Sequence, residues 1–248
     1  MDTLIAVAAS GMRSRLESLD ILANNLANAN TSGYKADHEA YQLYFGAGAT
    51  EDWGDNQPAP SSMPALGRDW IDMSQGTLID TGNMSDVALS GPGFFAVQTT
   101  TGTLYTRTGS FRVSKQRQLT TPEGFPVLGV GGQPITLDPA QPWTVSPNGA
   151  VMQGGAVAGT LEVVTTSSPG ALVKHGGTYF ALEPGNTMSV VADPSLLQGK
   201  VEGSNVPAPQ AAVKLVGVMR QFEMLQKAVR MAGDMDKQAI EQVARVSS

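Results

Sequence analysis

The stretch from Gln210 to about Val246 constrains the fold of this chain more than any other feature. Its apolar residues recur at alternating intervals of three and four, which is the a/d pattern of a heptad repeat sustained over roughly five repeats. The positions are Leu215, Val218, Phe222, Leu225, Val229 and Ala232, then Asp236, Ala239, Val243 and Val246. A lone helix with this stripe would expose it to water, so the pattern predicts a partner.

The beginning of the chain repeats the spacing. Between Thr3 and Asn28, one set of apolar residues is seven apart and a second set falls between them: Ile5, Met12, Leu19 and Leu26, with Ala9, Leu16 and Ala23. Small Ala side chains opposite larger ones let two helices approach closely. We therefore predict a helix from Asp2 or Thr3 to about Ala29 that pairs with the C-terminal helix as a coiled coil.

The residues between these helices have a different composition. The chain holds 28 Gly and 15 Pro, and charged residues make up 15%, below the roughly 25% of ordinary globular proteins. Short apolar runs from Thr77 to Val191 alternate with turn signals such as Gly82-Asn83 and Asn148-Gly149, which is typical of an antiparallel sandwich or barrel.

The predicted fold class is therefore α+β, with a mainly antiparallel β central domain, sandwich- or barrel-like, and long terminal helices paired as a coiled coil. The domain organisation that we expect is an N-terminal helix at 1–33, a linker with short strands at 34–74, a β-rich domain at 75–201, a second linker at 202–209 and a C-terminal helix at 210–248.

Composition also limits the partners. The net charge of −6, without a Lys/Arg run interleaved with aromatic residues, argues against nucleic-acid binding. The absence of cysteine excludes disulfides, thiolate metal sites and Cys nucleophiles. No apolar run approaches the roughly 18 residues of a membrane span, so we expect no membrane insertion. The N-terminus lacks the pattern of a cleaved signal peptide, so any export is expected to remove nothing.

Residues that could carry chemistry are scattered. His38 and His175 lack the spacing of metal ligands. Asp138, Glu162 and Glu183 lie in separate predicted elements, so the sequence does not pair them as a glycosidase would require. We predict no catalytic residue, no cofactor and no metal.

Four asparagines, Asn24, Asn25, Asn28 and Asn30, crowd the end of the first predicted helix, although Asn is a poor helix former. They could fray the helix toward its end. Alternatively, Asn24 and Asn28, one turn apart, could present their amides to an adjacent subunit and fix its register. The residues leave both interpretations open.

Several motifs together resemble a known family. Asn24-Asn-Leu-Ala-Asn28 followed by Asn30-Thr-Ser-Gly-Tyr-Lys35 is similar to the N-terminal signature of bacterial flagellar axial proteins, the proteins of the rod and hook. Three further stretches agree in the same order. The first runs from Gln75-Gly-Thr-Leu-Ile-Asp-Thr-Gly-Asn83 through Asp86-Val-Ala-Leu89 to Gly93-Phe-Phe-Ala-Val97, the second is Tyr105-Thr-Arg-Thr-Gly-Ser-Phe111 with Gly124-Phe-Pro-Val-Leu-Gly129, and the third is Val201-Glu-Gly-Ser-Asn-Val206. The likeness covers nearly the whole chain.

Within this family the chain most resembles the proximal-rod type, through its length, its opening Met1-Asp-Thr-Leu-Ile5 and its Gln221-Phe-Glu-Met224. The distal-rod type is the near alternative, and hook proteins are usually longer. One departure is Lys115-Gln-Arg-Gln118, where the family tends to have a Gly. We expect a different turn there.

The resemblance implies a structural subunit of the flagellar basal-body rod that crosses the periplasm. Its implied partners are copies of itself, other flagellar axial proteins and the flagellar export apparatus, which exports family members without signal-peptide cleavage. Terminal helices of the family order on assembly. The polymerisation interface that we predict on this basis comprises Ile5, Met12, Leu16, Leu19, Asn24, Asn25, Leu26, Asn28, Leu215, Val218, Phe222, Leu225 and Val229.

Met224, Met231 and Met235 lie off the main stripe of the last predicted helix. They are either gap-filling surface residues or a second apolar face for neighbouring subunits.

Two other classes of protein remain possible from the residues. One is a secreted β-sandwich enzyme or carbohydrate-binding module with a helical oligomerisation stalk, which would need clustered carboxylates or exposed aromatic residues. Trp53, Trp70 and Trp143 are scattered along the chain. The other is a cytoplasmic coiled-coil adaptor, which the long β segment disfavours.

Overall fold

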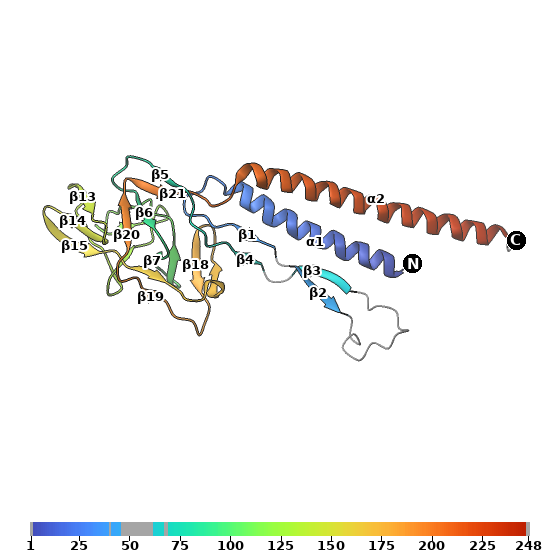
Figure 1. Cartoon of the computed structure of the whole chain (residues 1–248), viewed down its shortest axis with the longest axis horizontal. Helices are drawn as coiled ribbons and strands as arrows, with labels where there is room; N and C mark the ends of the chain where they lie inside the picture. The colour runs from blue at the N-terminus through green and yellow to red at the C-terminus, as the bar shows by residue number, and fades with distance from the viewer. Residues whose placement is uncertain (1, 40, 46–61, 67–68, 247–248) are drawn as a thin grey trace. The chain divides into compact units, whose positions relative to one another are not determined.

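The computed structural model describes residues 2–39, 41–45, 62–66 and 69–246. The chain divides into two compact units, each built from segments that are distant in sequence (Figure 1). Unit 1 contains Met1–Ala27, Asp37–Trp70 and Pro207–Ser248, and unit 2 contains Asn28–Ala36 and Ile71–Val206. Within the described ranges, no helix is long and apolar enough to cross a membrane.

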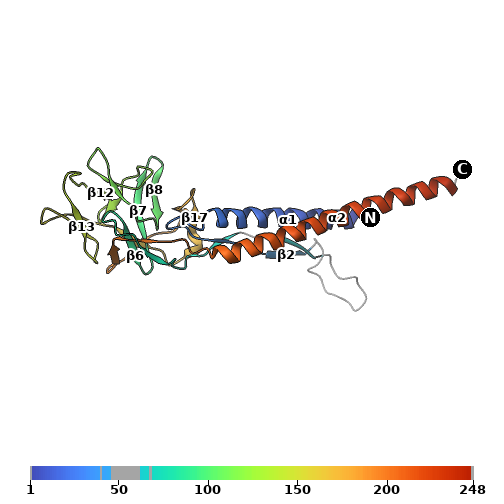
Figure 2. The same cartoon turned by 90° about the horizontal axis from the view of Figure 1, so that it is seen from above.

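Unit 1 is organised by the two terminal helices, α1 (Asp2–Ala27) and α2 (Ala208–Val246). The predicted start of the first helix at Asp2 is confirmed, and the helix ends two residues before the predicted Ala29. Pro207 and Pro209 flank the first residue of α2, where proline is tolerated because the first helical amides have no intrahelical acceptor. The two helices lie side by side and run in opposite directions (Figures 1 and 2).

The prediction that α1 and α2 pair as a coiled coil is wrong. On α1 the second set of the predicted core positions, Ala9, Leu16 and Ala23, is exposed. The side chains that α1 buries instead are Ser14, Ser18 and Asn25. These positions lie roughly on the opposite side of the helix from the Ala9 row, at 3.6 residues per turn, so the two heptad rows do not interlock.

A different face of α1 therefore meets α2. A Cβ added to Gly11 would lie 3.7 Å from Leu225 Cδ1, and Gly11 belongs to the same side of α1 as Ser14 and Ser18. The Ser18 hydroxyl donates to the carbonyl of Ser14 at 3.0 Å, which satisfies its polar group without a partner from another helix. The small residues Gly11, Ser14 and Ser18 on this face allow α2 to approach closely.

Unit 1 also contains short strands. β2 (Tyr41–Phe45) and β3 (Ser62–Leu66) form an antiparallel pair. β1 (Asp37–His38) pairs with β4 (Trp70–Ile71), and the His38 ring stacks on Trp70 with centroids 4.6 Å apart.

Unit 2 is built on a six-stranded sheet in the order β17-β18-β8-β7-β16-β19, in which all pairs are antiparallel. Its strands are β7 (Phe94–Thr99), β8 (Gly102–Thr106), β16 (Val163–Thr165), β17 (Leu172–Lys174), β18 (Tyr179–Leu182) and β19 (Ser189–Val190). A 3₁₀ helix, η1 (Pro169–Ala171), precedes β17.

Smaller antiparallel ladders complete the unit. A three-stranded sheet contains β13 (Trp143–Val145), β14 (Ala150–Gln153) and β15 (Ala156–Thr160). The two-stranded ladders are β5 (Leu78–Asp80) with β21 (Lys200–Glu202), β6 (Val87–Ser90) with β20 (Ser195–Gln198), β9 (Arg112–Val113) with β10 (Leu119–Thr120), and β11 (Leu128–Gly129) with β12 (Gln133–Pro134).

The predicted antiparallel character is present, but the predicted sandwich or barrel is not. The strands form a half-barrel around one main sheet, with short ladders in place of a second continuous sheet. Many of these ladders are only two or three residues long because turns interrupt them at short intervals.

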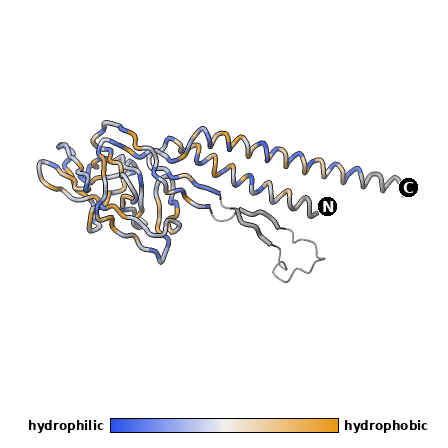
Figure 3. Tube along the Cα trace, viewed as in Figure 1, coloured by the Kyte–Doolittle hydropathy of each residue, from blue (hydrophilic) through white to orange (hydrophobic). Residues whose placement is uncertain are grey.

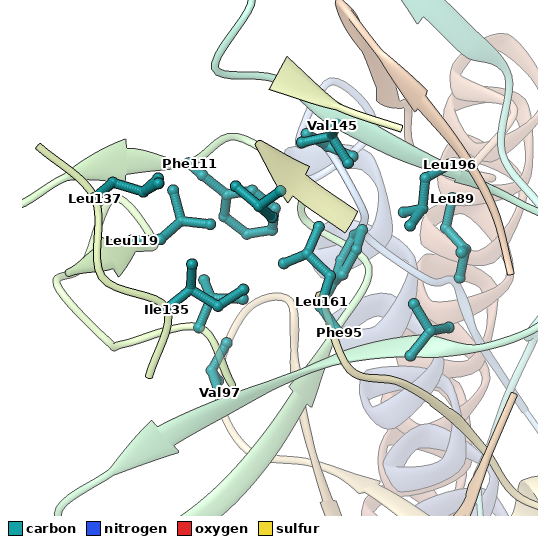
Figure 4. Close-up of a cluster of buried hydrophobic side chains, with 14 of the residues drawn as sticks. Leu89, Phe95, Val97, Phe111, Leu119, Ile135, Leu137, Val145, Leu161 and Leu196 are labelled. Carbon is teal, nitrogen blue, oxygen red and sulfur yellow. The ribbon is translucent and has the colours of Figure 1, made fainter. Parts of the chain in front are cut away.

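The apolar side chains of these ladders form a large core in unit 2 (Figure 4), beside a smaller cluster of Phe94, Leu172 and Phe180. Phe95 is fully buried and meets Phe111 edge to face, with ring centroids 5.2 Å apart. Leu119, Ile135 and Leu161 approach the same core from other strands (Figure 4). This core holds unit 2 together independently of the charged residues that are described next.

The turn at Lys115-Gln-Arg-Gln118 uses an unusual residue. Arg117 has φ 64°, the left-handed conformation that glycine favours. Its amide donates to Ser114 O at 3.0 Å, and Ser114 N donates to Gln118 O at 2.8 Å. The chain therefore retains a glycine-type conformation without a glycine at this position.

Candidate functional site

The predicted interface residues of α2 form one row. From Leu215 to Ala232, every partly buried residue of α2 belongs to this row, and the residues between them are exposed. The row includes Leu215, Val218, Phe222, Leu225 and Val229. Figure 3 shows apolar positions recurring along this helix between hydrophilic ones.

The predicted interface residues of α1 are more varied in their surroundings. Met12, Leu19 and Leu26 are partly buried, whereas 48% of Leu16 is exposed. The side chain of Ile5 lies outside the described residues. None of the described α1 residues in the predicted interface, apart from Asn25, is fully buried by its own chain.

The asparagines divide between two roles. Asn25 is buried and hydrogen-bonds both ways with the backbone of Asp37: its Nδ2 donates to Asp37 O at 2.7 Å, and Asp37 N donates to its Oδ1 at 3.0 Å. It therefore fixes β1 against α1. Asn24 is exposed and Asn28 is partly buried, and Thr31 Oγ1 donates to Asn28 Oδ1 at 3.2 Å.

A second apolar stripe lies on α2. Exposed fractions are 74% for Val213, 62% for Met224, 61% for Met231 and 68% for Met235. At 3.6 residues per turn, this stripe lies roughly 120° around the helix from the row that begins at Leu215. A helix that is apolar on two sides is suited to contact more than one partner.

Unit 2 buries a cluster of three charged side chains. Lys35 Nζ lies 2.5 Å from Glu202 Oε1, and Arg107 Nη1 lies 3.2 Å from Glu202 Oε2. The side chains of Lys35 and Glu202 are 0% exposed and that of Arg107 is 4% exposed. We call these three residues the ion cluster.

Backbone groups complete the coordination of the ion cluster. Lys35 Nζ donates to Ser74 O at 2.6 Å, and Arg107 Nη2 donates to Gly91 O at 2.8 Å. Glu202 Oε1 also accepts from Gly76 N at 3.0 Å. Within the part of the chain that the structure describes, Arg107 Nε is buried without a hydrogen-bond acceptor.

The ion cluster contains two positive side chains and one negative one, because the Glu202 carboxylate pairs with both Lys35 and Arg107. Burial lowers the pKa of Lys35 and of Arg107, and the charge of Glu202 opposes the shift in both. Burying such charges costs more than their attraction returns unless the geometry is good. Removing one partner of the ion cluster would leave an uncompensated buried charge, which is strongly destabilising.

The sequence analysis did not find the ion cluster. Three separate motifs contain its members, Lys35, Arg107 and Glu202, and nothing in the sequence linked them. Lys35 and Glu202 are 167 positions apart. The one available signal was that each of the three lies one to two residues from a glycine in a chain whose charged residues make up only 15%.

A second group of charges lies in unit 1. Burial, followed by the negative charges of Asp37, Glu17 and Glu39, raises the pKa of Asp69. Among the described residues, no group of three or more His, Cys, Asp or Glu side chains has the arrangement of a metal site.

Comparison with known proteins matches three stretches of the chain to family models. Residues 5–35 match "Flagella basal body rod protein", residues 88–153 match "Flagellar hook protein FlgE/F/G D1 domain" and residues 197–242 match "Flagellar basal body rod FlgEFG protein C-terminal". The flagellar basal-body rod protein FlgF of Caulobacter vibrioides is 31% identical over 248 residues, which cover 100% of both chains. The chain belongs to the flagellar basal-body rod protein family.

Other members of the rod family agree with this assignment. FlgF of Escherichia coli is 32% identical over 94% of this chain and 95% of its own. The rod protein FlgG of Agrobacterium fabrum is 30% identical over 93% of this chain and 95% of its own. The resemblance to flagellar axial proteins is thereby confirmed, and the chain is FlgF-like. Each of the three matched stretches contributes one member of the ion cluster, Lys35, Arg107 and Glu202 in turn.

Proposed function

We propose that this rod-family subunit acts in the proximal part of the flagellar basal-body rod and joins its neighbours through the exposed apolar surfaces of α1 and α2. The observation that carries the proposal is the second stripe of α2, in which Val213, Met224, Met231 and Met235 are each exposed by more than half. Exposed apolar residues in a row mark a surface that another molecule covers.

The surface of α1 supports the same proposal. Leu16 is half exposed, and the residues one heptad before and after it, Ala9 and Ala23, are also exposed. Since each helix carries apolar positions that its own chain leaves in water, burial by neighbouring subunits would stabilise an assembly.

The partners in this proposal are copies of the chain and other flagellar axial proteins. The predicted interface residues contribute unequally: Leu16 and the partly buried Met12, Leu19 and Leu26 are placed to contact neighbours, whereas Asn25 acts within the chain. Export through the flagellar apparatus without cleavage is also part of the proposal.

The alternative position is the distal rod, because identity to the FlgG relative is nearly as high as identity to the FlgF relatives. The test is to isolate basal bodies from cells that carry this chain but lack their FlgG protein. The proposal predicts that the chain, as a proximal subunit, is retained in these particles. Loss of the chain from the particles would assign it to the distal rod instead.

A further inference from the structure

The ion cluster joins the two segments by which the chain enters and leaves unit 2. We propose that Lys35, Arg107 and Glu202 form a lock that holds the entering segment, 28–36, against the leaving segment, 202–206, and that this lock is required for incorporation of the subunit into the rod. The requirement for incorporation rests on the proposed function. In this proposal, Lys35, Arg107 and Glu202 position the two segments relative to each other.

Backbone contacts show that the two segments run against each other. Gly33 N donates to Glu202 O at 2.7 Å, and Asn205 N donates to Tyr34 O at 3.4 Å. Ala36 N donates to Asn205 Oδ1 at 2.8 Å, and Asn205 Nδ2 donates to Asp72 O at 2.8 Å. The entering and leaving segments are therefore hydrogen-bonded to each other beside the ion cluster.

Two glycines allow backbone segments to approach each other closely around the ion cluster. A Cβ on Gly33, whose φ is +72°, would lie 2.5 Å from Thr108 N, and a Cβ on Gly76 would lie 2.0 Å from Gly203 O. Both contacts are with backbone, which cannot move aside as a flexible side chain can. Gly33 thus lets the entering segment lie against the backbone beside Arg107, and Gly76 lets its own segment lie against the leaving segment at Gly203, next to Glu202.

A charged cluster suits a lock better than an apolar one. Apolar side chains pack in many registers, whereas a buried charge without its partner is strongly disfavoured. Glu202 receives hydrogen bonds from Lys35, Gly76 and Arg107, so its carboxylate is satisfied only when three segments arrive together. The apolar core around Phe95 and Leu119 contains none of the three charged residues and can hold unit 2 without them.

Charge balance makes the lock asymmetric. Removal of Arg107 leaves Lys35 and Glu202 as a neutral pair, whereas removal of Glu202 leaves two cations buried side by side. Arg107 Nε has no acceptor in the described structure, and the guanidinium is held by Glu202, Gly91 O and the face of the Phe94 ring, 5.3 Å from Cζ. We expect Glu202→Gln to open the lock and Arg107→Gln to open it far less.

The experiment is hydrogen exchange of the full-length chain, read at Gly33, Gly76 and Ala36 for the lock, with Leu119 and Val127 as amides of the core. In Glu202→Gln, exchange of the lock amides is expected to accelerate by roughly a hundredfold, the change implied by breaking a buried ion pair, while the core amides keep their rates. Arg107→Gln is expected to change the lock amides far less. Unchanged lock amides in Glu202→Gln, or equal acceleration in the core, would overturn the lock.

Incorporation into basal bodies separates the lock from the proposed function. Cells that lack the native subunit are given wild type, Glu202→Gln or the surface variant Met231→Asp, and their isolated basal bodies are probed for the chain. We expect both variants to be missing, with lock exchange altered only in Glu202→Gln. Normal incorporation of Glu202→Gln alone would refute the role of the lock in assembly, whereas normal incorporation of Met231→Asp would refute the assembly surface.

Discussion

Replacing Met224, Met231 and Met235 together with Gln removes most of the second apolar stripe of α2. Their exposed fractions are 62%, 61% and 68%. Complete burial of a Met side chain contributes about 1.5–3 kcal/mol, so burying the exposed part of each contributes roughly 1–2 kcal/mol. For all three, the loss at an interface is therefore roughly 3–6 kcal/mol as an upper value.

This loss of free energy corresponds to a measurable loss of affinity for the rod. Each 1.4 kcal/mol corresponds to tenfold in affinity, so the subunit is expected to bind the growing rod roughly 10²–10⁴-fold more weakly. Met and Gln have similar helix propensities, and the three side chains are exposed in the free chain. Helix content and the unfolding midpoint should therefore stay close to those of the wild type.

The assay is complementation of cells that lack the native subunit, with swimming and the amount of the chain in isolated basal bodies as readouts. A matched control replaces three exposed charged residues of the same helix, Glu223, Lys227 and Lys237, with Gln. The account predicts normal incorporation for this control and a severe loss for the methionine variant. Equal incorporation of both variants would refute the reasoning that the stripe is buried in the rod.

Three further substitutions, one of them with a matched control, test local parts of the structure. In Gly109→Ala the added Cβ would lie 1.7 Å from Val87 O, so urea unfolding is expected to show a loss of roughly 3 kcal/mol or more, whereas Gly170→Ala, which meets nothing within 4 Å, should be nearly neutral. Arg117→Gly relieves a left-handed φ of 64° and should raise the free energy of unfolding by about 1 kcal/mol. The pKa of Asp69 is higher in the folded chain than its unfolded value of 3.8. Its contribution to the free energy of unfolding is therefore fully present below pH 3.8 and is lost as pH rises through the folded pKa, where the ionised carboxylate destabilises the folded state. Asp69→Asn should therefore raise the urea midpoint at pH 7 and leave it almost unchanged below pH 3.8, with a small effect because Asp69 is exposed.

Local signals predicted the helices better than their contacts. The heptad spacing identified both helices and the partly buried row of α2, because that spacing is a property of the local sequence. It did not identify the face of α1 that its own chain buries. Ser14, Ser18 and Asn25 are buried because they are small or hydrogen-bonded, and hydrophobic periodicity does not register either property.

Long-range features escaped sequence reasoning for a related reason. Turn signals marked where strands end, but closure of a sheet depends on pairings between distant segments, so the half-barrel was mistaken for a sandwich or barrel. The ion cluster depends on the same kind of contact, since Lys35 and Glu202 are 167 positions apart in the sequence. Their charges were visible in the sequence, but their proximity was not.

The most direct measurement is the reactivity of a single thiol on the second stripe. The chain contains no cysteine, so Met231→Cys introduces one unique site for a maleimide reagent. The account predicts fast labelling of the free subunit, in which this position is exposed, and labelling slowed by roughly tenfold or more in isolated basal bodies, as burial at a packed interface implies. Equal labelling rates in the free and assembled states would show that neighbouring subunits do not cover the stripe, and would contradict the account.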